Sequence, residues 1–289
     1  MTGDNYHQNN NNNFIVTRKQ YPLVSNKELK NISEQLFDEL PNILHSLNLN
    51  FQVKKYSKST KDECLFPLFT IPKEFFESFP ILQLIYKLYD NYNIYSNHAE
   101  DMTVEENIEE NAFINSLLDT KIMANTMNFL ATKGYFRKNL DTYKQIIKKI
   151  WFGLYSRSNH TSLGSSGFEH VFLVEQRKDR RIIGLHNWIF FAIEESNEKV
   201  NYLGYINNKR IDNKAVVAEL YFNYLNKTKS SSMFIGTLPE FDIALYTICF
   251  FTRPNKNCNI QLKNEKITIQ SWVQHSHNEK FIASSFPKV

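Results

Sequence analysis

The spacing of apolar residues changes near position 158, and this change constrains the fold more than any other feature of the chain. In the first half, apolar residues recur every three or four positions, as in Leu29, Ile32, Leu36 and Leu40, which is typical of helices that bury one face. After RSNHTSLGSSG the runs FEHVFLVEQ, NYLGYI and AVVAELYFNYL alternate and are rich in β-forming residues, which predicts strands. The chain therefore divides into a helical part and a later strand-rich part.

We place the boundaries of these parts from composition and from loop-forming segments. Residues 1–13 are rich in Asn and nearly free of apolar groups, so they cannot offset the entropy of ordering and are expected to be disordered. Residues 14–157 form the predicted helical region, and residues 158–289 form the β-rich region. The helical region includes a core-facing stripe that begins at Tyr143 and continues through Trp151 to Leu154.

Local signals refine several of these elements. Thr103-Val-Glu-Glu106 and Thr237-Leu-Pro-Glu240 match the capping box that opens helices. FEHVFLVEQ and IIGLHNWIFFAI flank the charged segment RKDRR, which predicts a β-hairpin. KITIQSWVQ and KFIASSF predict a closing pair of strands.

Composition excludes several functional classes. The 289 residues carry 34 basic and 30 acidic side chains, a balance too mild to demonstrate nucleic-acid binding by itself. Three cysteines, none in a Cys-x-x-Cys pair, predict neither a disulfide framework nor structural zinc. No secretory signal and no apolar run of eighteen residues is visible, so we expect a cytoplasmic or nuclear protein in a reducing compartment, with no membrane partner.

Two histidines lie within the predicted hairpin, His170 in FEHVF and His186 in GLHNW. A single strand histidine is usually structural, but two on neighbouring strands also suit acid–base chemistry near neutral pH. Strand alternation would place His170 on one face and the carboxylates Glu169 and Glu175 on the other. From the residues alone, a structural role and an acid–base pair both remain open.

The blocks GSSGFEHVFLVE, GLHNWI and FIGTLPEFDIALYTICF resemble the signature blocks of the poly(U)-specific endoribonuclease (EndoU) family. The resemblance runs from about residue 25 to residue 289 and includes LYDNY, TVEENIEENAF and IWFGLYSR. It implies one unit with an α+β fold, in which a helical N-terminal region precedes a catalytic part of two small antiparallel sheets with flanking helices.

The resemblance also implies a function. Such enzymes cleave single-stranded RNA at uridylates by attack of the ribose 2′-OH, which leaves a 2′,3′-cyclic phosphate. Two histidines and a lysine are the minimal set for this lyase-type reaction, and each acid–base role is worth roughly 10²–10⁴-fold. A protein of the same fold that binds RNA with weak or lost nuclease activity is the alternative, favoured by Leu238 and by a displaced lysine motif.

The resemblance assigns residues as follows. His170 and His186 match the catalytic histidines, with His170 preferred as the base, and Glu169 and Glu175 match glutamates that matter for activity. One lysine of NKTKSSSMFIGT completes the catalytic set, and the family's K-x-x-S-S order favours Lys227 over Lys229.

Substrate contacts and cofactors follow from the same resemblance. Ser232, Thr237, Ser271 and Trp272 are expected to contact the substrate, with the last two at the uracil, where stacking on Trp272 is worth about 1–3 kcal/mol per base. Mn²⁺ is expected as a loosely bound stimulator, because no carboxylate cluster with octahedral spacing is visible. Any contact would be through the substrate phosphate or through Glu169 and Glu175. We expect a monomer whose partner is uridine-containing RNA.

Overall fold

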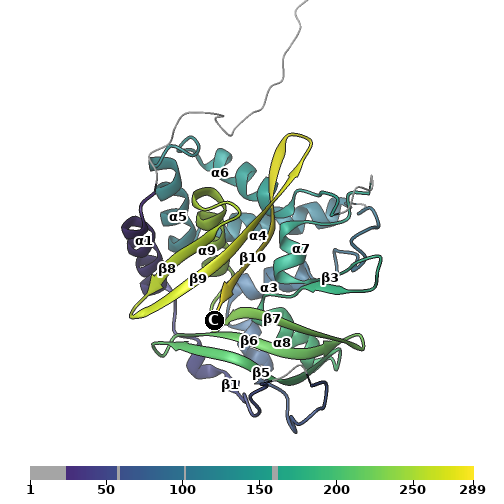
Figure 1. Ribbon diagram of the computed structural model, residues 1–289. Helices are drawn as coiled ribbons and strands as arrows, with labels where there is room; N and C mark the ends of the chain where they lie inside the picture. Colours follow the sequence, from purple (N-terminus) through teal and green to yellow (C-terminus); the bar gives the residue numbers. More distant parts are fainter. Residues whose placement is uncertain (1–23, 57–58, 101, 158–161) are drawn as a thin grey trace, which may run out of the picture.

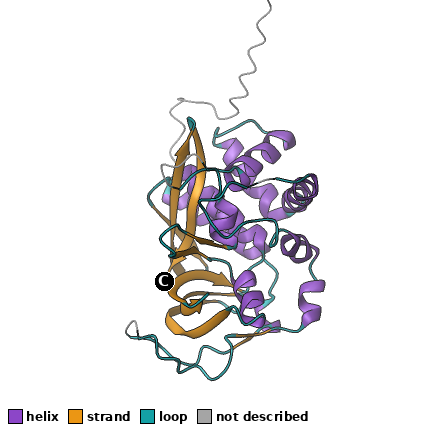
Figure 2. Ribbon diagram, turned by 90° about the vertical axis from the view of Figure 1, so that its right-hand side faces the viewer, coloured by secondary structure: helices purple, strands orange, loops and turns teal. Residues whose placement is uncertain are grey.

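The computed structural model describes residues 24–56, 59–100, 102–157 and 162–289, so the predicted disordered tail at residues 1–13 lies outside it. Strands gather on one side of the molecule and helices on the other (Figure 2). The helices are α1 (Asn26–Glu39), η1 (Leu44–Ser46), α2 (Lys73–Glu77), α3 (Pro80–Lys87), α4 (Val104–Leu118), α5 (Lys121–Thr132), α6 (Leu140–Ile147), the π-helix η2 (Lys148–Phe152), α7 (Gly167–Phe172), α8 (Trp188–Ser196) and α9 (Pro239–Thr252).

The strands form two three-stranded antiparallel sheets, in the orders β5-β6-β7 and β10-β9-β8, and two small hairpins, β1-β2 and β3-β4 (Figure 1). Helices come first in the chain and the two larger sheets come later, so the predicted α+β class is confirmed. The strands are β1 (Asn48–Leu49), β2 (Phe69–Thr70), β3 (Val174–Gln176), β4 (Ile182–Gly184), β5 (Val200–Ile211), β6 (Ala215–Tyr224), β7 (Lys227–Ile235), β8 (Asn257–Leu262), β9 (Glu265–Ser276) and β10 (Glu279–Lys288).

Helix starts follow local side-chain chemistry. The Thr103 side chain accepts a hydrogen bond from the backbone N–H of Glu106, and the Glu106 side chain accepts one from the backbone of Thr103, so the predicted capping box of α4 is confirmed. The predicted box at Thr237 is wrong. Helix α9 begins at Pro239 without a side-chain cap, because the Thr237 hydroxyl instead donates to Asp242 Oδ1 at 2.8 Å.

The segment FEHVF is a helix rather than the predicted strand. Ser166 caps α7 by accepting a hydrogen bond from the backbone N–H of Glu169 at 3.1 Å. Phe168, Val171 and Phe172 are fully buried; Phe168 and Phe172 would share a face in a strand or a helix, but Val171 joins them only in a helix. Only the β3-β4 pair, on either side of RKDRR, forms the predicted hairpin.

The segment HNWIFF also departs from the predicted strand. Strand β4 stops at Gly184, and Asn187 then caps α8 by accepting hydrogen bonds from the backbone N–H groups of Ile189 and Phe190, both at 3.1 Å. An Asn side chain that satisfies two orphan donors is a strong helix start. The aromatic run that follows therefore packs as a helix.

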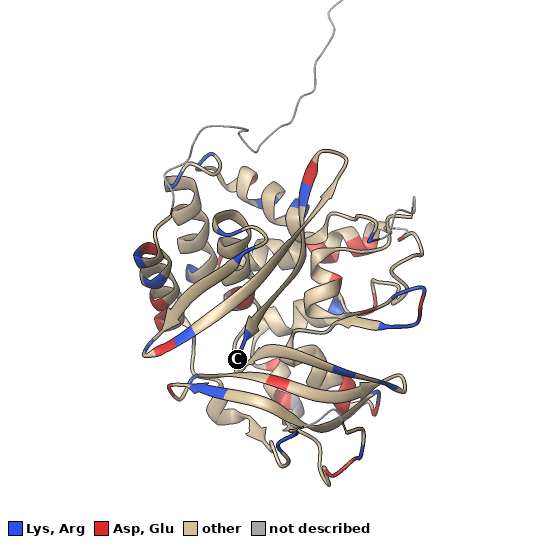
Figure 3. Ribbon diagram, viewed as in Figure 1, with Lys and Arg blue, Asp and Glu red and all other residues tan. Residues whose placement is uncertain are grey.

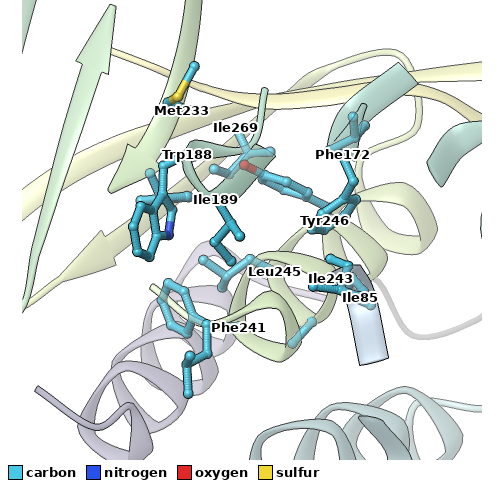
Figure 4. Packing of buried hydrophobic residues seen from close by; sticks show 14 of the residues in the cluster. Ile85, Phe172, Trp188, Ile189, Met233, Phe241, Ile243, Leu245, Tyr246 and Ile269 are labelled. Carbon is cyan, nitrogen blue, oxygen red and sulfur yellow. The ribbon is translucent and has the colours of Figure 1, made fainter. Parts of the chain in front are cut away.

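Helix α9 lies at the centre of the hydrophobic core, with every residue from Pro239 to Phe250 buried. Figure 4 shows Phe241 and Tyr246 of this helix packed among buried residues of other elements, such as Trp188. Apolar side chains of the helical region and of the β-rich region belong to one buried cluster. The two predicted regions therefore share a core.

Cys249 and Cys258 form a disulfide that joins α9 to β8, with a Cα–Cα distance of 5.6 Å. The cysteine count did not predict this bond, and disulfides persist mainly in oxidising compartments. The bond therefore does not favour the reducing compartment that the sequence suggested. Among the described residues, no helix has the length and apolar character needed to span a membrane.

Candidate active site

His170 and His186 lie next to each other because the end of β4 packs directly against α7. The backbone N–H groups of Leu185 and His186 donate to the carbonyls of His170 and Val171, at 3.1 and 2.9 Å. Gly184 makes this approach feasible: its φ is +78°, and a Cβ there would lie 2.2 Å from the His170 carbonyl oxygen. The two imidazole centroids are 5.6 Å apart.

Glu175 holds His170 directly, which corrects the prediction that the two side chains lie on opposite faces. Glu175 Oε2 is 2.6 Å from His170 Nδ1. Strand alternation does not apply because the histidine is on α7 and the carboxylate is on β3. Glu175 is fully buried, and both of its oxygens have partners: Arg157 Nε lies 3.0 Å from Oε1 and 2.9 Å from Oε2, and the Ser165 hydroxyl donates to Oε1.

These contacts determine the charge of both groups. Burial alone would raise the pKa of Glu175, but Arg157 and the His170 hydrogen bond lower it to about 2. Burial, with the charge of Arg157, lowers the pKa of His170 to about 4, against the opposing effect of Glu175. At neutral pH the imidazole is therefore uncharged. With its Nδ1–H donated to Glu175, its Nε2 lone pair can accept a proton.

Glu169 lies on α7 with a different environment. Its side chain is 1% exposed, and neither carboxyl oxygen has a hydrogen-bond partner among the described residues. Burial, reinforced by the negative charges of Glu175 and Glu100, raises its pKa well above the ordinary value. Burial therefore favours the protonated form of Glu169, and its carboxyl group does not hold either histidine.

His186 is positioned by β7 and β10. Its Nδ1 lies 3.1 Å from the Ser232 carbonyl oxygen and 2.8 Å from the Ser231 hydroxyl. The Phe286 ring stacks on the imidazole, with centroids 4.5 Å apart and planes 13° apart. Burial, with the positive charge of Lys229, lowers the pKa of His186 well below the ordinary value. Nε2 is the nitrogen that these contacts leave for chemistry.

Of the two candidate lysines, Lys229 is the one close to the histidines. It lies two residues before Ser231 on β7, so both side chains point to the same face, roughly 7 Å apart along the strand. Its charge acts on both imidazoles and on Glu175. Burial lowers the pKa of Lys229 to about 8. Lys227 is exposed and about a further 7 Å along the strand.

The β9-β10 pair turns one face toward His186 and the other into the core. Phe286 and Ser284 alternate along β10 on the histidine side, and Trp272 is the cross-strand partner of Ser284. Trp272 is 48% exposed, whereas the buried Ser284 hydroxyl has no partner among the described residues. Ser271, predicted to contact uracil, is fully buried on the opposite face.

Thr237, predicted to contact the substrate, is buried in this arrangement. Thr237 is 1% exposed, with its hydroxyl donated to Asp242 and its carbonyl oxygen accepting from Trp188 Nε1 at 2.7 Å.

No group of three or more His, Cys, Asp or Glu side chains that could hold a metal ion occurs in the described part of the chain. Because the oxygens of Glu175 are fully engaged, the residues present do not fit a dedicated Mn²⁺ site.

Sequence reasoning missed three kinds of supporting residue. Arg157, at the end of the IWFGLYSR block, links Glu175 to β10 through the carbonyl oxygen of Ala283 at 2.8 Å. Ser231 and Phe286 orient His186 from strands far away in the chain. The conspicuous run of three serines before MFIG was the available signal for Ser231, whereas nothing local singles out Phe286.

The arrangement suits proton transfer across a phosphate ester. Two imidazoles, each with Nδ1 engaged by protein and Nε2 left for a substrate, can act on either side of one phosphorus atom, the uncharged one as a base and the other, once protonated, as an acid. Lys229 lies where it can offset negative charge that develops between them. An added phosphodiester would raise the pKa of both histidines, because its negative charge favours the imidazolium form.

Comparisons with known proteins agree with this chemistry. Residues 28–287 match the family described as Endoribonuclease XendoU. The chain is 33% identical over 279 residues to uridylate-specific endoribonuclease D of Xenopus laevis, covering 92% of this chain and 90% of that protein. It is 32% identical over 275 residues to poly(U)-specific endoribonuclease-A of the same organism, covering 91% and 94%.

A solved structure supports the same relationship. The structure described as "XendoU: a splicing independent snoRNA processing endoribonuclease" superposes with a TM-score of 0.75 at 29% sequence identity, covering 91% of this chain and 97% of that chain. The alignments with this chain therefore cover more than two thirds of the length of each of these three proteins.

Proposed function

Because this chain belongs to the XendoU endoribonuclease family, we propose that it cleaves single-stranded RNA at uridylates by transphosphorylation. The observation that carries the proposal is the pair of imidazoles with centroids 5.6 Å apart, one of them held by a buried carboxylate at 2.6 Å. No other group of side chains in the described residues offers two poised acid–base groups and a cation together.

The steps follow from the state of each group. His170 Nε2 takes the proton of the ribose 2′-OH, whose oxygen then forms a bond to the adjacent phosphorus. The bond from phosphorus to the 5′-oxygen breaks, and His186, in the imidazolium form that the bound phosphate favours, gives its Nε2 proton to that departing oxygen. The products are a 2′,3′-cyclic phosphate and a 5′-OH. The contact between His170 Nδ1 and the Glu175 carboxylate at 2.6 Å supports its assignment as the base, because a carboxylate partner makes Nε2 a better proton acceptor.

Lys229 is the residue that we assign to stabilise the phosphorane, in place of the Lys227 that motif order favoured. Its charge acts on both imidazoles and on Glu175, whereas Lys227 lies exposed at the strand end. This placement also weakens the alternative of a protein that only binds RNA, since the displaced lysine motif was a main reason to consider it.

We also propose that the uracil lies against the β9-β10 face that carries Ser284, Trp272 and Phe286. An unused buried hydroxyl can donate to or accept from the edge of a base, and an exposed indole offers a stacking surface. Ser271 is on the core face, so we assign the hydroxyl role to Ser284 instead.

Cleavage of an end-labelled RNA oligonucleotide with a single uridine tests the proposal. The expected product carries a 2′,3′-cyclic phosphate by mass spectrometry, and a 2′-deoxyuridine at that position blocks cleavage while binding persists. Reactions with EDTA and with added Mn²⁺ separate metal stimulation from the basic chemistry. A 3′-OH product contradicts the mechanism, and binding without any cleavage would favour the non-catalytic alternative.

A further inference from the structure

The turn between β3 and β4 carries an exposed cluster of basic side chains at the edge of the active site. Residues 177–181 read RKDRR, and Figure 3 shows their charges gathered at the hairpin tip. Asp179 is paired with Arg181 at 2.6 Å. No ion pair to Arg177, Lys178 or Arg180 occurs among the described residues. These three cations are therefore available to an external anion.

The hairpin links this cluster directly to the catalytic centre. Glu175, the residue that binds His170, is on β3 only two residues before Arg177. Backbone hydrogen bonds close the turn, from Arg177 N–H to the Arg181 carbonyl at 2.9 Å and from Arg180 N–H to the Arg177 carbonyl at 2.8 Å. At about 3.3 Å per residue, the cations begin roughly 7 Å from Glu175 along the strand, and the turn brings Arg180 back beside Arg177.

An exposed aromatic ring lies alongside the same hairpin. The loop containing Tyr95 runs parallel to β3, with a bridge between Tyr95 and Gln176. The backbone N–H of Ser96 donates to the Gln176 carbonyl at 3.1 Å. The Tyr95 ring is 44% exposed and contacts the ring of His98, with centroids 5.1 Å apart. A polar ring anchored by backbone but open to solvent is suited to stack on a base.

We propose that residues 177–181, together with Tyr95, form a single-stranded RNA arm that binds nucleotides flanking the cleaved uridylate. Arg177, Lys178 and Arg180 would contact phosphates, and Tyr95 would stack on one unpaired base. The proposal rests on the assigned endoribonuclease function, because it names how the same site holds the rest of its substrate. Backbone contact with base stacking predicts binding that tolerates sequence and weakens with salt.

Equilibrium binding tests the arm without relying on cleavage. The probe is a fluorescent twelve-nucleotide RNA whose one uridine is replaced by 2′-deoxyuridine, titrated at several salt concentrations. For single strands the slope of log affinity against log salt is about 0.7 per neutralised phosphate, so substituting all three cations by Gln should reduce it by about 2. When the salt concentration rises from 50 to 200 mM, the affinity of the triple variant for RNA should therefore fall about 16-fold less than that of the unaltered protein.

Matched variants separate the arm from general charge. Replacing the exposed Lys121, Arg137 and Lys138 by Gln removes the same charge near α5 and α6, and this control should leave the slope within error of the unaltered protein. Tyr95→Ala should weaken binding of the single strand by at least about fivefold, and should not change binding of a duplex of the same sequence.

Turnover of the dinucleotide UpA distinguishes this inference from the proposed function. The dinucleotide is too short to reach the turn, so the arm variants should cleave it at the unaltered rate. Absence of UpA cleavage by the unaltered protein would refute the nuclease assignment while the binding result still decides the arm. Equal slopes in the arm and control variants, or full affinity after Tyr95→Ala, would overturn the arm.

Discussion

Substituting Lys229 by Met should remove most of the nuclease activity, whereas Lys227→Met should change it by less than about twofold. The two variants make the same chemical change on one face of β7, two residues apart. Only Lys229 is close enough for its charge to act on both histidines. Loss of one preorganised charge-stabilising donor costs about 10²–10³-fold in kcat, which is about 3–4 kcal/mol of transition-state stabilisation.

The pH dependence adds a second measurement. Because burial lowers the pKa of Lys229 to about 8, the lysine is protonated below that pH and loses its charge as the pH rises through it. Its contribution to the rate should therefore be present at pH 7 and decline between pH 7 and 9. Lys229→Arg keeps a charge throughout this range, so any activity that it retains should not show this decline.

Single-turnover cleavage of UpA between pH 6 and 9 measures both effects, because it reports the chemical step without product release. Melting temperatures of the four proteins serve as the control for folding. If Lys227→Met is the inactive variant, the assignment of the two lysines is reversed. Full activity in both Met variants would refute an electrostatic role for this strand.

The remaining predictions concern the histidines, their carboxylate, the base site and the metal. His170→Ala and His186→Ala should each remove most of the turnover in single-turnover assays, and the double variant should be little worse than either, because groups that act as a unit are non-additive. Glu175 has a folded pKa of about 2, below its unfolded value, so the stability that it contributes is present at neutral pH and is lost as the pH falls toward 2. Chemical denaturation from pH 7 to 3 should show this loss of stability. Glu175→Gln should make the stability depend less on pH over this range. Ser284→Ala should reduce the preference for uridine over cytidine in competitive cleavage, whereas Ser271→Ala should leave that preference unchanged. Mn²⁺ should stimulate only at high micromolar to millimolar concentrations, roughly as for weak oxygen sites, and elemental analysis of dialysed protein should find no stoichiometric metal.

Local sequence signals predicted much of the helical framework. Thr103 opens α4 with a reciprocal capping box, as expected from residue types three positions apart. The α9 helix and the closing β9-β10 pair were also predicted, although the capping box that predicted the start of α9 does not form. These elements depend on neighbours within a few residues, so the printed sequence already contains the interactions that stabilise them.

Short apolar runs were less informative. FEHVF fits an alternating strand and also fits a helical face, and the difference depends on whether Ser166 caps a helix. Helix α7 instead of a strand changes the relation between His170 and Glu175, because strand alternation would have separated them. A run of five residues cannot decide between the two periods on its own.

The sequence by itself determined which chemical groups this protein has: two histidines in recognisable blocks, a paired glutamate, and lysines before a serine run. Only the tertiary structure decided which of them meet. Arg157 and Ala283 are 126 positions apart, and so are linked only when β10 packs beside the loop after η2. Position along β7 likewise selects Lys229 over Lys227, and the parity of residues on β9 excludes Ser271. The physical reason is that hydrogen bonds and charges act over a few ångströms in space, and long-range packing alone brings distant segments within that range.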